Sequence, residues 1–126
     1  MIILTSPIIG EILEDNPFSL IAYITGAGGA PITVASMTAI AYVVFDLTSA
    51  TPDTAMASGS FQVNQSVFDT PRIESGITYN FRGELPAGVL TDGGHVYDIE
   101  VQFIPVAGEV FRLPPFRVTT QPLRSI

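Results

Sequence analysis

Short runs in which apolar and polar residues alternate dominate the chain, and no long run repeats with the 3.6-residue period of a helix. The clearest alternation covers residues 95–104, where Tyr97, Ile99 and Val101 point to one side and acidic or amide residues point to the other. This pattern is typical of a strand with one buried and one solvated face. Clusters of Gly, Pro, Asn and Asp separate the runs, so the spacing predicts an all-β sandwich.

Five further runs are rich in the residues that favour strands, mainly Val, Ile, Tyr, Phe and Thr. Together the six expected strands lie at residues 18–25, 38–47, 55–63, 78–84, 95–104 and 110–119. In the fourth strand, Tyr79 and Phe81 are expected to face the core, while Asn80 and Arg82 face the solvent. The Pro114-Pro115 pair interrupts the last strand, and because proline cannot donate to a ladder we expect a bulge or kink there.

The turn before the clearest strand supports a more specific fold. Residues 92–94 read Asp-Gly-Gly and are followed by Tyr97, an order that resembles the tyrosine corner of immunoglobulin-like sandwiches. In that corner a tyrosine near the start of strand F bonds back to the backbone upstream. The expected fold class is therefore all-β, with an apolar N-terminal strand or arm at 1–16, a single immunoglobulin-like β-sandwich at 17–120, and a C-terminal tail at 121–126.

Two of the expected strands are apolar on both faces. They cover residues 19–24 and 39–45, and they lie inside a stretch, residues 16–45, that has no charged side chain. A strand with one wet face should alternate, so a further surface must cover the outward side chains. In a chain this small we expect that surface to belong to another protein. The candidate interface residues are Ile2, Ile3, Leu4, Ile8, Ile9, Ile21, Tyr23, Ala41, Val43 and Phe45.

Charge is scarce and unevenly distributed along the chain. Charged residues make up 13% of the sequence, hydrophobic residues make up 47%, and the net charge is −7. The first positive residue is Arg72, so the chain lacks the basic surface that nucleic-acid binding requires. Glycines and a proline within residues 26–31 divide the uncharged stretch into two parts. Neither part reaches the about 20 apolar residues that a membrane-spanning helix needs. We expect neither a nucleic-acid nor a membrane partner.

Few residues could support catalysis. The chain has no cysteine and no lysine, and its single histidine is His95. Asp92 is close to it but is explained as a turn residue, and the loop aspartates do not follow the spacing of a calcium loop. The glycine-rich residues 26–30 lack the lysine and the following helix that a phosphate loop needs. We therefore expect no catalytic residue, no bound metal, no cofactor and no enzymatic activity.

Several motifs in the second half occur in an order that resembles small structural proteins of tailed bacteriophages. Residues 79–82 read Tyr-Asn-Phe-Arg and lead to a Leu-Pro-Ala turn at 85–87. A Gly-x-x-Tyr strand start at 94–97 and a Pro-x-x-Gly-Glu hairpin at 105–109 follow. The Ile-Ala-Tyr-x-x-x-Asp-Leu run at 40–47 is similar to the first central strand of those proteins. The resemblance implies a virion component, in the first place a capsid cement or decoration protein.

The resemblance also implies partners and a location. The expected partner is the major capsid protein or another virion protein. The chain is expected to form a homo-oligomer, and a trimer would suit a threefold position of the capsid. The expected location is the virion, which is assembled in the host cytoplasm. Two alternatives stay open: a neck or tail accessory protein, and a surface-exposed immunoglobulin-like module that binds carbohydrate or the host surface. For the carbohydrate alternative, Phe68 is the evident loop aromatic.

Overall fold

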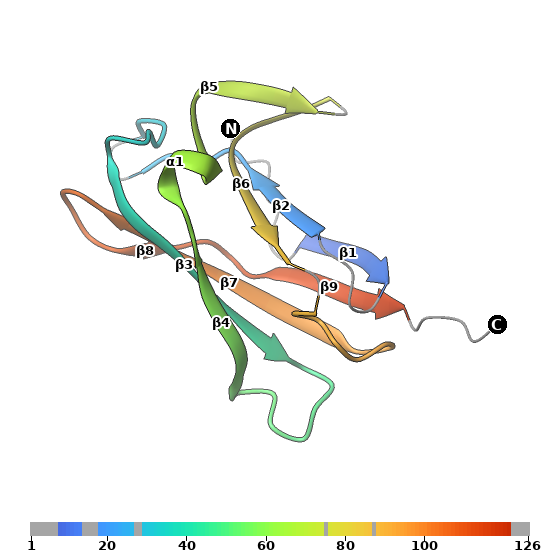
Figure 1. Cartoon of the computed structure of the whole chain (residues 1–126). Coiled ribbons are helices and arrows are strands. Elements are labelled where there is room, and N and C mark those ends of the chain that lie inside the picture. Colours follow the sequence, from blue (N-terminus) through green and yellow to red (C-terminus); the bar gives the residue numbers. More distant parts are fainter. Residues whose placement is uncertain (1–7, 14–17, 27–28, 75, 87, 122–126) are drawn as a thin grey trace.

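The computed structural model describes residues 8–13, 18–26, 29–74, 76–86 and 88–121, and these residues form two sheets packed face to face, with all strand pairs antiparallel except one (Figure 1). The all-β sandwich expected from the sequence is confirmed. The larger sheet has the strand order β1-β9-β7-β3-β4, with β8 also paired to β7. Its strands are β1 (Ile8–Leu13), β3 (Met37–Asp46), β4 (Ala55–Phe61), β7 (Val96–Pro105), β8 (Phe111–Arg112) and β9 (Phe116–Gln121).

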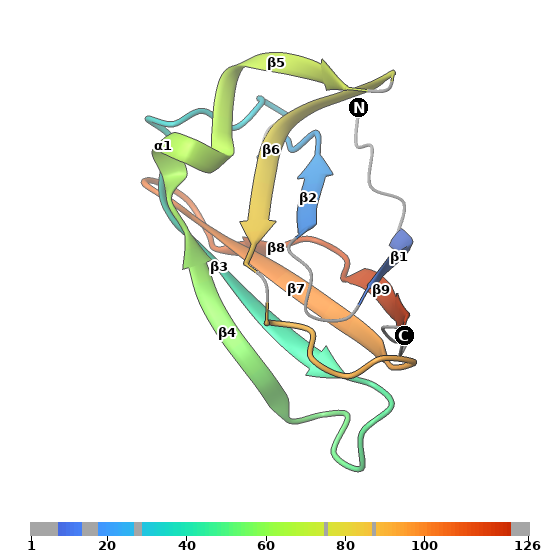
Figure 2. The same cartoon turned by 45° about the vertical axis from the view of Figure 1, so that its right-hand side comes forward.

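The smaller sheet lies across the first and has the order β2-β6-β5 (Figure 2). Its strands are β2 (Phe18–Ala22), β5 (Val67–Glu74) and β6 (Ile77–Leu85), and one helical turn, α1 (Val63–Ser66), leads from the larger sheet into β5. The chain therefore changes sheet four times, between β1 and β2, between β2 and β3, between β4 and β5, and between β6 and β7. This is the Greek-key order of an immunoglobulin-like sandwich in which a strand beside strand C widens the sheet of strands C, F and G.

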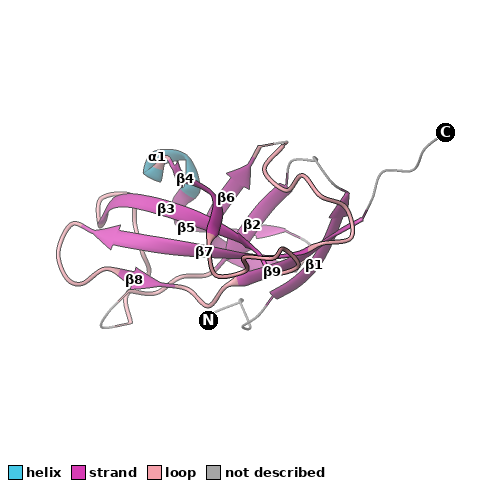
Figure 3. Ribbon diagram, turned by 90° about the horizontal axis from the view of Figure 1, so that it is seen from below, coloured by secondary structure: helices cyan, strands magenta, loops and turns pink. Residues whose placement is uncertain are grey.

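The two ends of the described chain meet at one edge of the larger sheet. Strand β1 runs parallel to β9, with Ile8 opposite Phe116 and Leu13 opposite Gln121 (Figure 3). Residues 8–13 are thus a strand of this sheet, and the rest of the expected N-terminal arm lies outside the described residues. The kink expected at Pro114-Pro115 is present, because the chain forms two separate strands, β8 and β9, on either side of it.

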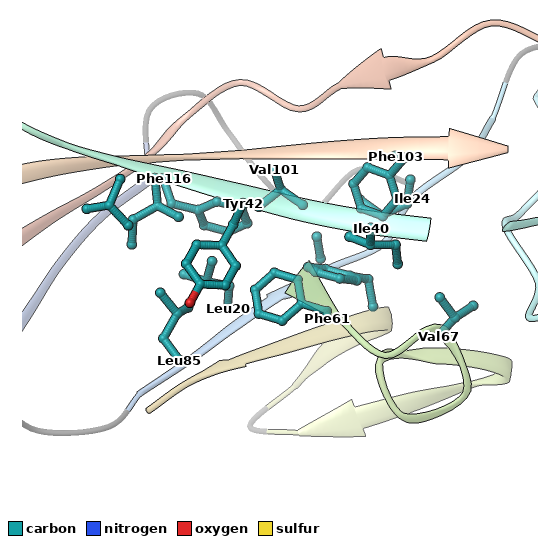
Figure 4. Packing of buried hydrophobic residues seen from close by; sticks show 14 of the residues in the cluster. Leu20, Ile24, Ile40, Tyr42, Phe61, Val67, Leu85, Val101, Phe103 and Phe116 are labelled. Carbon is teal, nitrogen blue, oxygen red and sulfur yellow. The ribbon is translucent and has the colours of Figure 1, made fainter. Parts of the chain in front are cut away.

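Alternating side chains of the two central strands build the core. On β3 and β7 every second residue is buried, so their inward faces meet the smaller sheet. A continuous row of aromatic rings crosses between the sheets, with centroid distances of 4.9, 5.8, 5.2 and 5.1 Å between successive rings. The rings belong to Tyr42, Phe61, Phe81, Phe103 and Phe111. Tyr42 and Phe61 are seen side by side in the core (Figure 4).

Glycine makes room for this row where it crosses β6. A Cβ atom added at Gly83 would lie 2.7 Å from Cζ of Phe61 and 2.9 Å from Cζ of Phe81. Both distances are shorter than side-chain atoms tolerate in a packed core, and both rings are buried. The absence of a side chain at this position therefore allows the two rings to approach each other.

The prediction that Asn80 faces the solvent is wrong, because this residue is completely buried. Its Oδ1 accepts a hydrogen bond from the backbone N–H of Ile24 at 2.7 Å, and its Nδ2 donates to the Ile24 carbonyl at 2.9 Å. The regular pairing of β2 with β6 ends at Ala22 opposite Phe81. The Asn80 amide thus supplies the partner of the buried Ile24 N–H, and it shares the Ile24 carbonyl with the Ile32 N–H, which lies 3.2 Å from that oxygen.

The expected tyrosine corner is confirmed. The Tyr97 hydroxyl accepts a hydrogen bond from the Asp92 N–H at 3.0 Å and donates to the Asp92 carbonyl at 3.3 Å. Thr120 on β9 closes the same corner, since its hydroxyl donates to the Asp92 carbonyl and its N–H donates to the His95 carbonyl. The end of the loop that leads into β7 is therefore fixed to β7 and to β9 at one end of the sandwich.

Candidate functional site

The structure places five candidate interface residues on outward faces of the two sheets. Ala41, Val43 and Phe45 of β3 are partly exposed and alternate with buried neighbours. Ile21 of β2 and Tyr23, the first residue after this strand, are also partly exposed, whereas Leu20, Ala22 and Ile24 next to them are buried. These side chains therefore point away from the core of their own subunit.

The N-terminal candidates are described less fully. Ile2, Ile3 and Leu4 lie outside the described residues. Ile8 and Ile9 belong to β1, where their backbones are opposite Phe116 and Arg117 of the same chain.

The outward face of the larger sheet has a charged half. On β7, Asp98 receives two hydrogen bonds from Arg117 of β9, at 2.8 and 3.0 Å, a bidentate arrangement. The hydrogen bond to Asp98 raises the pKa of Arg117 above its usual range, so the Arg117 guanidinium group stays positively charged. Glu100, also on β7, lies 3.9 Å from Arg112 of β8. The two acidic residues of β7 thus interact with arginines of β9 and β8.

The other half of this face carries no charge. Residues that are opposite each other in an antiparallel pair share one face, and Val43 is opposite Ser58 while Ala41 is opposite Ser60. We call this surface the β3–β4 face. It consists of the outward side chains of Ala39, Ala41, Val43, Phe45, Ser58 and Ser60. Charge is therefore distributed unevenly over this sheet, with the ion pairs beside β8 and β9 and an uncharged surface two strands wide over β3 and β4.

A second cluster of polar groups lies at the end of the sandwich that holds the tyrosine corner. Asp46, the last residue of β3, is 5% exposed, and its Oδ2 lies 2.7 Å from Nδ1 of His95. The other oxygen of Asp46 accepts a hydrogen bond from the Thr48 N–H at 3.0 Å. Asp92 contributes a carboxylate oxygen 3.9 Å from the same histidine nitrogen. Sequence reasoning missed the Asp46–His95 contact because 49 residues separate the two along the chain.

The geometry of this cluster is that of a hydrogen-bonded pair. Two ligands about 2.0–2.1 Å from a tetrahedral zinc ion would be about 3.3 Å apart, which is longer than the 2.7 Å between His95 and Asp46. A catalytic histidine would need a nucleophile within hydrogen-bonding reach of its second nitrogen. Among the described residues, no hydroxyl makes such a bond to His95. The cluster therefore connects the end of β3 to the start of β7.

Replacing His95 with Ala tests this structural role. We expect the free energy of unfolding to fall by about 1–3 kcal/mol at neutral pH, because the buried Asp46 carboxylate loses its side-chain partner. Urea denaturation followed by circular dichroism measures the change. The control is Asp92→Asn, which removes an exposed carboxylate and should change stability by less than about 0.5 kcal/mol. Equal losses in the two variants would contradict the assignment of Asp46 as the main partner.

A polar hollow of about 580 Å³ lies where α1, β5 and β6 meet. It contains Phe68, the aromatic residue that the carbohydrate alternative singled out. The guanidinium group of Arg72 lies over the Phe68 ring at 4.0 Å, and Tyr79 approaches the ring edge-on with centroids 5.9 Å apart. A sugar would therefore have to displace Arg72 before it could stack on that face of the ring.

The sequence matches no protein-family model, and the search of curated proteins found no match. No helix among the described residues is long and apolar enough to cross a membrane.

Proposed function

We propose that the chain is a non-enzymatic structural protein of a phage virion, most specifically a capsid cement or decoration protein that self-associates and stabilises the head. The observation that carries the proposal is the β3–β4 face. It is an uncharged, partly apolar surface formed by the central strand β3 and the edge strand β4, beside a half in which acidic residues pair with arginines. The bacteriophage resemblance of the sequence supplies the capsid as the setting.

Burial of the β3–β4 face would provide the binding energy. Removal of apolar surface from water contributes about 25 cal/mol per Å², and Val43 and Phe45 still expose part of their surface in the isolated subunit. Because this face has no charge, a partner such as the major capsid protein would not need to desolvate an ion pair in order to cover it. The charged half would remain hydrated at the rim of the contact.

The alternatives have less support. A neck or tail accessory protein would use the same face, so it differs only in the identity of the partner. A carbohydrate-binding module would need an open aromatic platform, and Phe68 is stacked against Arg72. A trimer remains the oligomer that a threefold capsid position would favour.

The direct test is co-sedimentation of the purified protein with capsid shells that lack it, together with its mass in solution. The proposal expects binding that saturates at a fixed number of copies per shell, and shells that resist heat or low salt better once decorated. A protein that stays monomeric and does not sediment with shells would rule out the cement role. A glycan array would then test the carbohydrate alternative.

Replacing Val43 with Asp tests the face itself. The new carboxylate would lie in the middle of the contact and next to Glu100, which is opposite Val43 on β7. We expect shell binding to weaken at least about tenfold, because an unpaired charge would be buried in the contact. The isolated domain should lose less than about 1 kcal/mol, since the side chain faces outward. Sedimentation with shells and urea denaturation measure the two effects.

The matched control is Val106→Asp, the same change at a valine that is 66% exposed in the hairpin between β7 and β8. This variant should bind shells like the wild type. If Val43→Asp unfolds the domain, the outward side of β3 is covered by the chain itself. If both variants bind shells normally, the β3–β4 face is not the contact.

A further inference from the structure

Strand β4 ends the larger sheet and lacks the features that usually keep an edge strand from pairing. Natural edges are protected by charged residues, prolines, bulges or very short strands. The seven residues of β4 read Ala-Met-Ala-Ser-Gly-Ser-Phe and include neither a charge nor a proline. Its one irregularity, a register shift opposite Val44 and Phe45, falls at its first two residues. Five residues, from Ala57 to Phe61, therefore form a regular, unpaired edge.

The edge strands of the smaller sheet differ from β4. Strand β5 carries Asp69, Pro71 and Arg72, and its register with β6 breaks between Val67 and Arg72. Strand β2 is shorter, with five residues. Its neighbour β6 carries two charged residues, Arg82 opposite Ile21 and Glu84 opposite Ser19.

At the far edge of the larger sheet, β1 includes Glu11. The short strand β8, which pairs with β7, carries Arg112. Among the edge strands in the described part of the chain, β4 alone is a charge-free strand of this length whose partner residues, Ile40 to Phe45 of β3, are also uncharged. It is consequently the edge at which a further strand could be added with the least electrostatic cost.

We propose that β4 pairs antiparallel with β4 of a second copy of this chain, across a two-fold axis, so that two larger sheets become one. The inference deepens the proposed function, on which it partly rests: pairing would place two β3–β4 faces side by side and double the width of the uncharged surface offered to a shell. An added strand satisfies the free backbone donors and acceptors of the edge, which is the usual basis of recognition between sheet edges.

Charge and symmetry identify the second copy as the occupant. Two subunits with a net charge of −7 repel each other over most of their surfaces. At β4 and the paired part of β3 they can meet without bringing like charges together. A strand that pairs antiparallel with itself makes a self-complementary contact closed by two subunits. The exposed side chains of Ser58 and Ser60 are small enough to lie beside their symmetry mates.

This contact predicts an even number of subunits. A single strand pair buries less surface than a standard protein interface, so we expect a weak dimer that dissociates on dilution. A trimer has no two-fold axis of this kind. An assembly that used both a threefold contact and the β4 contact would be a hexamer.

The test is sedimentation velocity of the full chain from low to high micromolar concentration, for the wild type and for Ser58→Lys. The wild type should change from monomer to an even-numbered oligomer as concentration rises. Ser58→Lys places two like charges close to the axis, and the dimer should weaken at least about tenfold. Its far-ultraviolet circular dichroism and thermal unfolding should match the wild type, because Ser58 is exposed.

The matched control is Thr70→Lys, which adds the same charge at an exposed position of β5, the protected edge. It should associate like the wild type. Hydrogen exchange gives an independent measure: amides of residues 57–61 should exchange more slowly in concentrated than in dilute wild-type protein. A wild type that is monomeric throughout, a trimer, or association that Ser58→Lys leaves unchanged would each overturn the inference.

The outcomes also separate this inference from the cement proposal. A β4-dependent dimer that does not bind shells would keep the inference and reject the cement role. A monomer that binds shells, and whose binding Val43→Asp abolishes, would reject the inference and keep the cement role.

Discussion

Replacing Phe81 with Ala is expected to lower the free energy of unfolding by about 3–5 kcal/mol. Phe81 is completely buried on β6 and is the central ring of the aromatic row, with Phe61 and Phe103 on either side at 5.8 and 5.2 Å. It is the one ring of that row contributed by the smaller sheet. Its removal would therefore leave a cavity between the two sheets, where the surrounding strands are hydrogen-bonded and cannot easily move inward.

Guanidinium or urea denaturation measures this loss, which is large compared with the about 5–15 kcal/mol total stability of a domain. The matched control is Phe111→Ala, because Phe111 stacks on Phe103 at the outer end of the row and is only partly buried. It should cost less than half as much. Phe81→Leu should recover most of the loss. Similar costs for Phe81→Ala and Phe111→Ala would mean that the row is not the link between the sheets.

The period-2 pattern was enough to predict the sandwich and its central strands. In β7 the buried and exposed residues alternate as the sequence indicated, and the Asp-Gly turn before Tyr97 predicted the tyrosine corner. Such features depend on local geometry alone: alternate residues of a strand face opposite sides, and a glycine-rich turn favours a reversal. Local patterns therefore identify elements well where one face is dry and the other wet.

Other elements could not be predicted because their sequences do not alternate. The segment 63–74 forms α1 and β5, yet it includes Pro71, which normally argues against a strand. Proline is tolerated there because β5 is an edge strand and its ladder with β6 is interrupted. The position of a strand within its sheet, which decides whether proline is allowed, depends on the whole fold.

Contacts between distant segments were also beyond the sequence. For β3, both sides read as apolar, so the pattern alone did not distinguish core from surface. The structure resolves this because Tyr42 and Val44 meet the smaller sheet, whereas Val43 and Phe45 face outward. The Asp46–His95 pair required the register of β3 with β7, in which Asp46 is opposite Tyr97. Only pairing between strands brings these residues together.

After Phe81→Ala, the second-largest loss of stability is expected when the polar side chain of Asn80 is removed. Its amide satisfies both the N–H and the carbonyl of Ile24, a residue only 1% exposed. Replacing Asn80 with Leu would leave the buried Ile24 N–H without a partner, which costs about 1–3 kcal/mol. It would also remove one of the two hydrogen bonds to the Ile24 carbonyl, worth about 0.5–1.5 kcal/mol, because the Ile32 N–H remains as the other donor. We expect a total loss of about 2–4 kcal/mol. Asn64→Leu, which changes an exposed amide on α1, should stay within about 0.5 kcal/mol of the wild type.

Asn80→Asp separates the loss of the amide from the loss of its volume. The carboxylate would keep the bond from the Ile24 N–H but would present an oxygen to the Ile24 carbonyl, in a site without solvent. Burial and this repulsion would raise its pKa in the folded state above the unfolded value of about 3.9. Because the folded state would then hold the proton more tightly than the unfolded state, the variant should lose stability as pH rises above about 4.

Below that pH the protonated carboxyl can again donate to the Ile24 carbonyl. The stability of Asn80→Asp should then approach the wild-type value measured at the same pH. Urea denaturation of both proteins at pH 4 and pH 7 gives the comparison, with Asn80→Leu as the reference that has no titrating group. A gap between Asn80→Asp and the wild type that stays the same at the two pH values would show that the Asn80 amide does not donate to the Ile24 carbonyl.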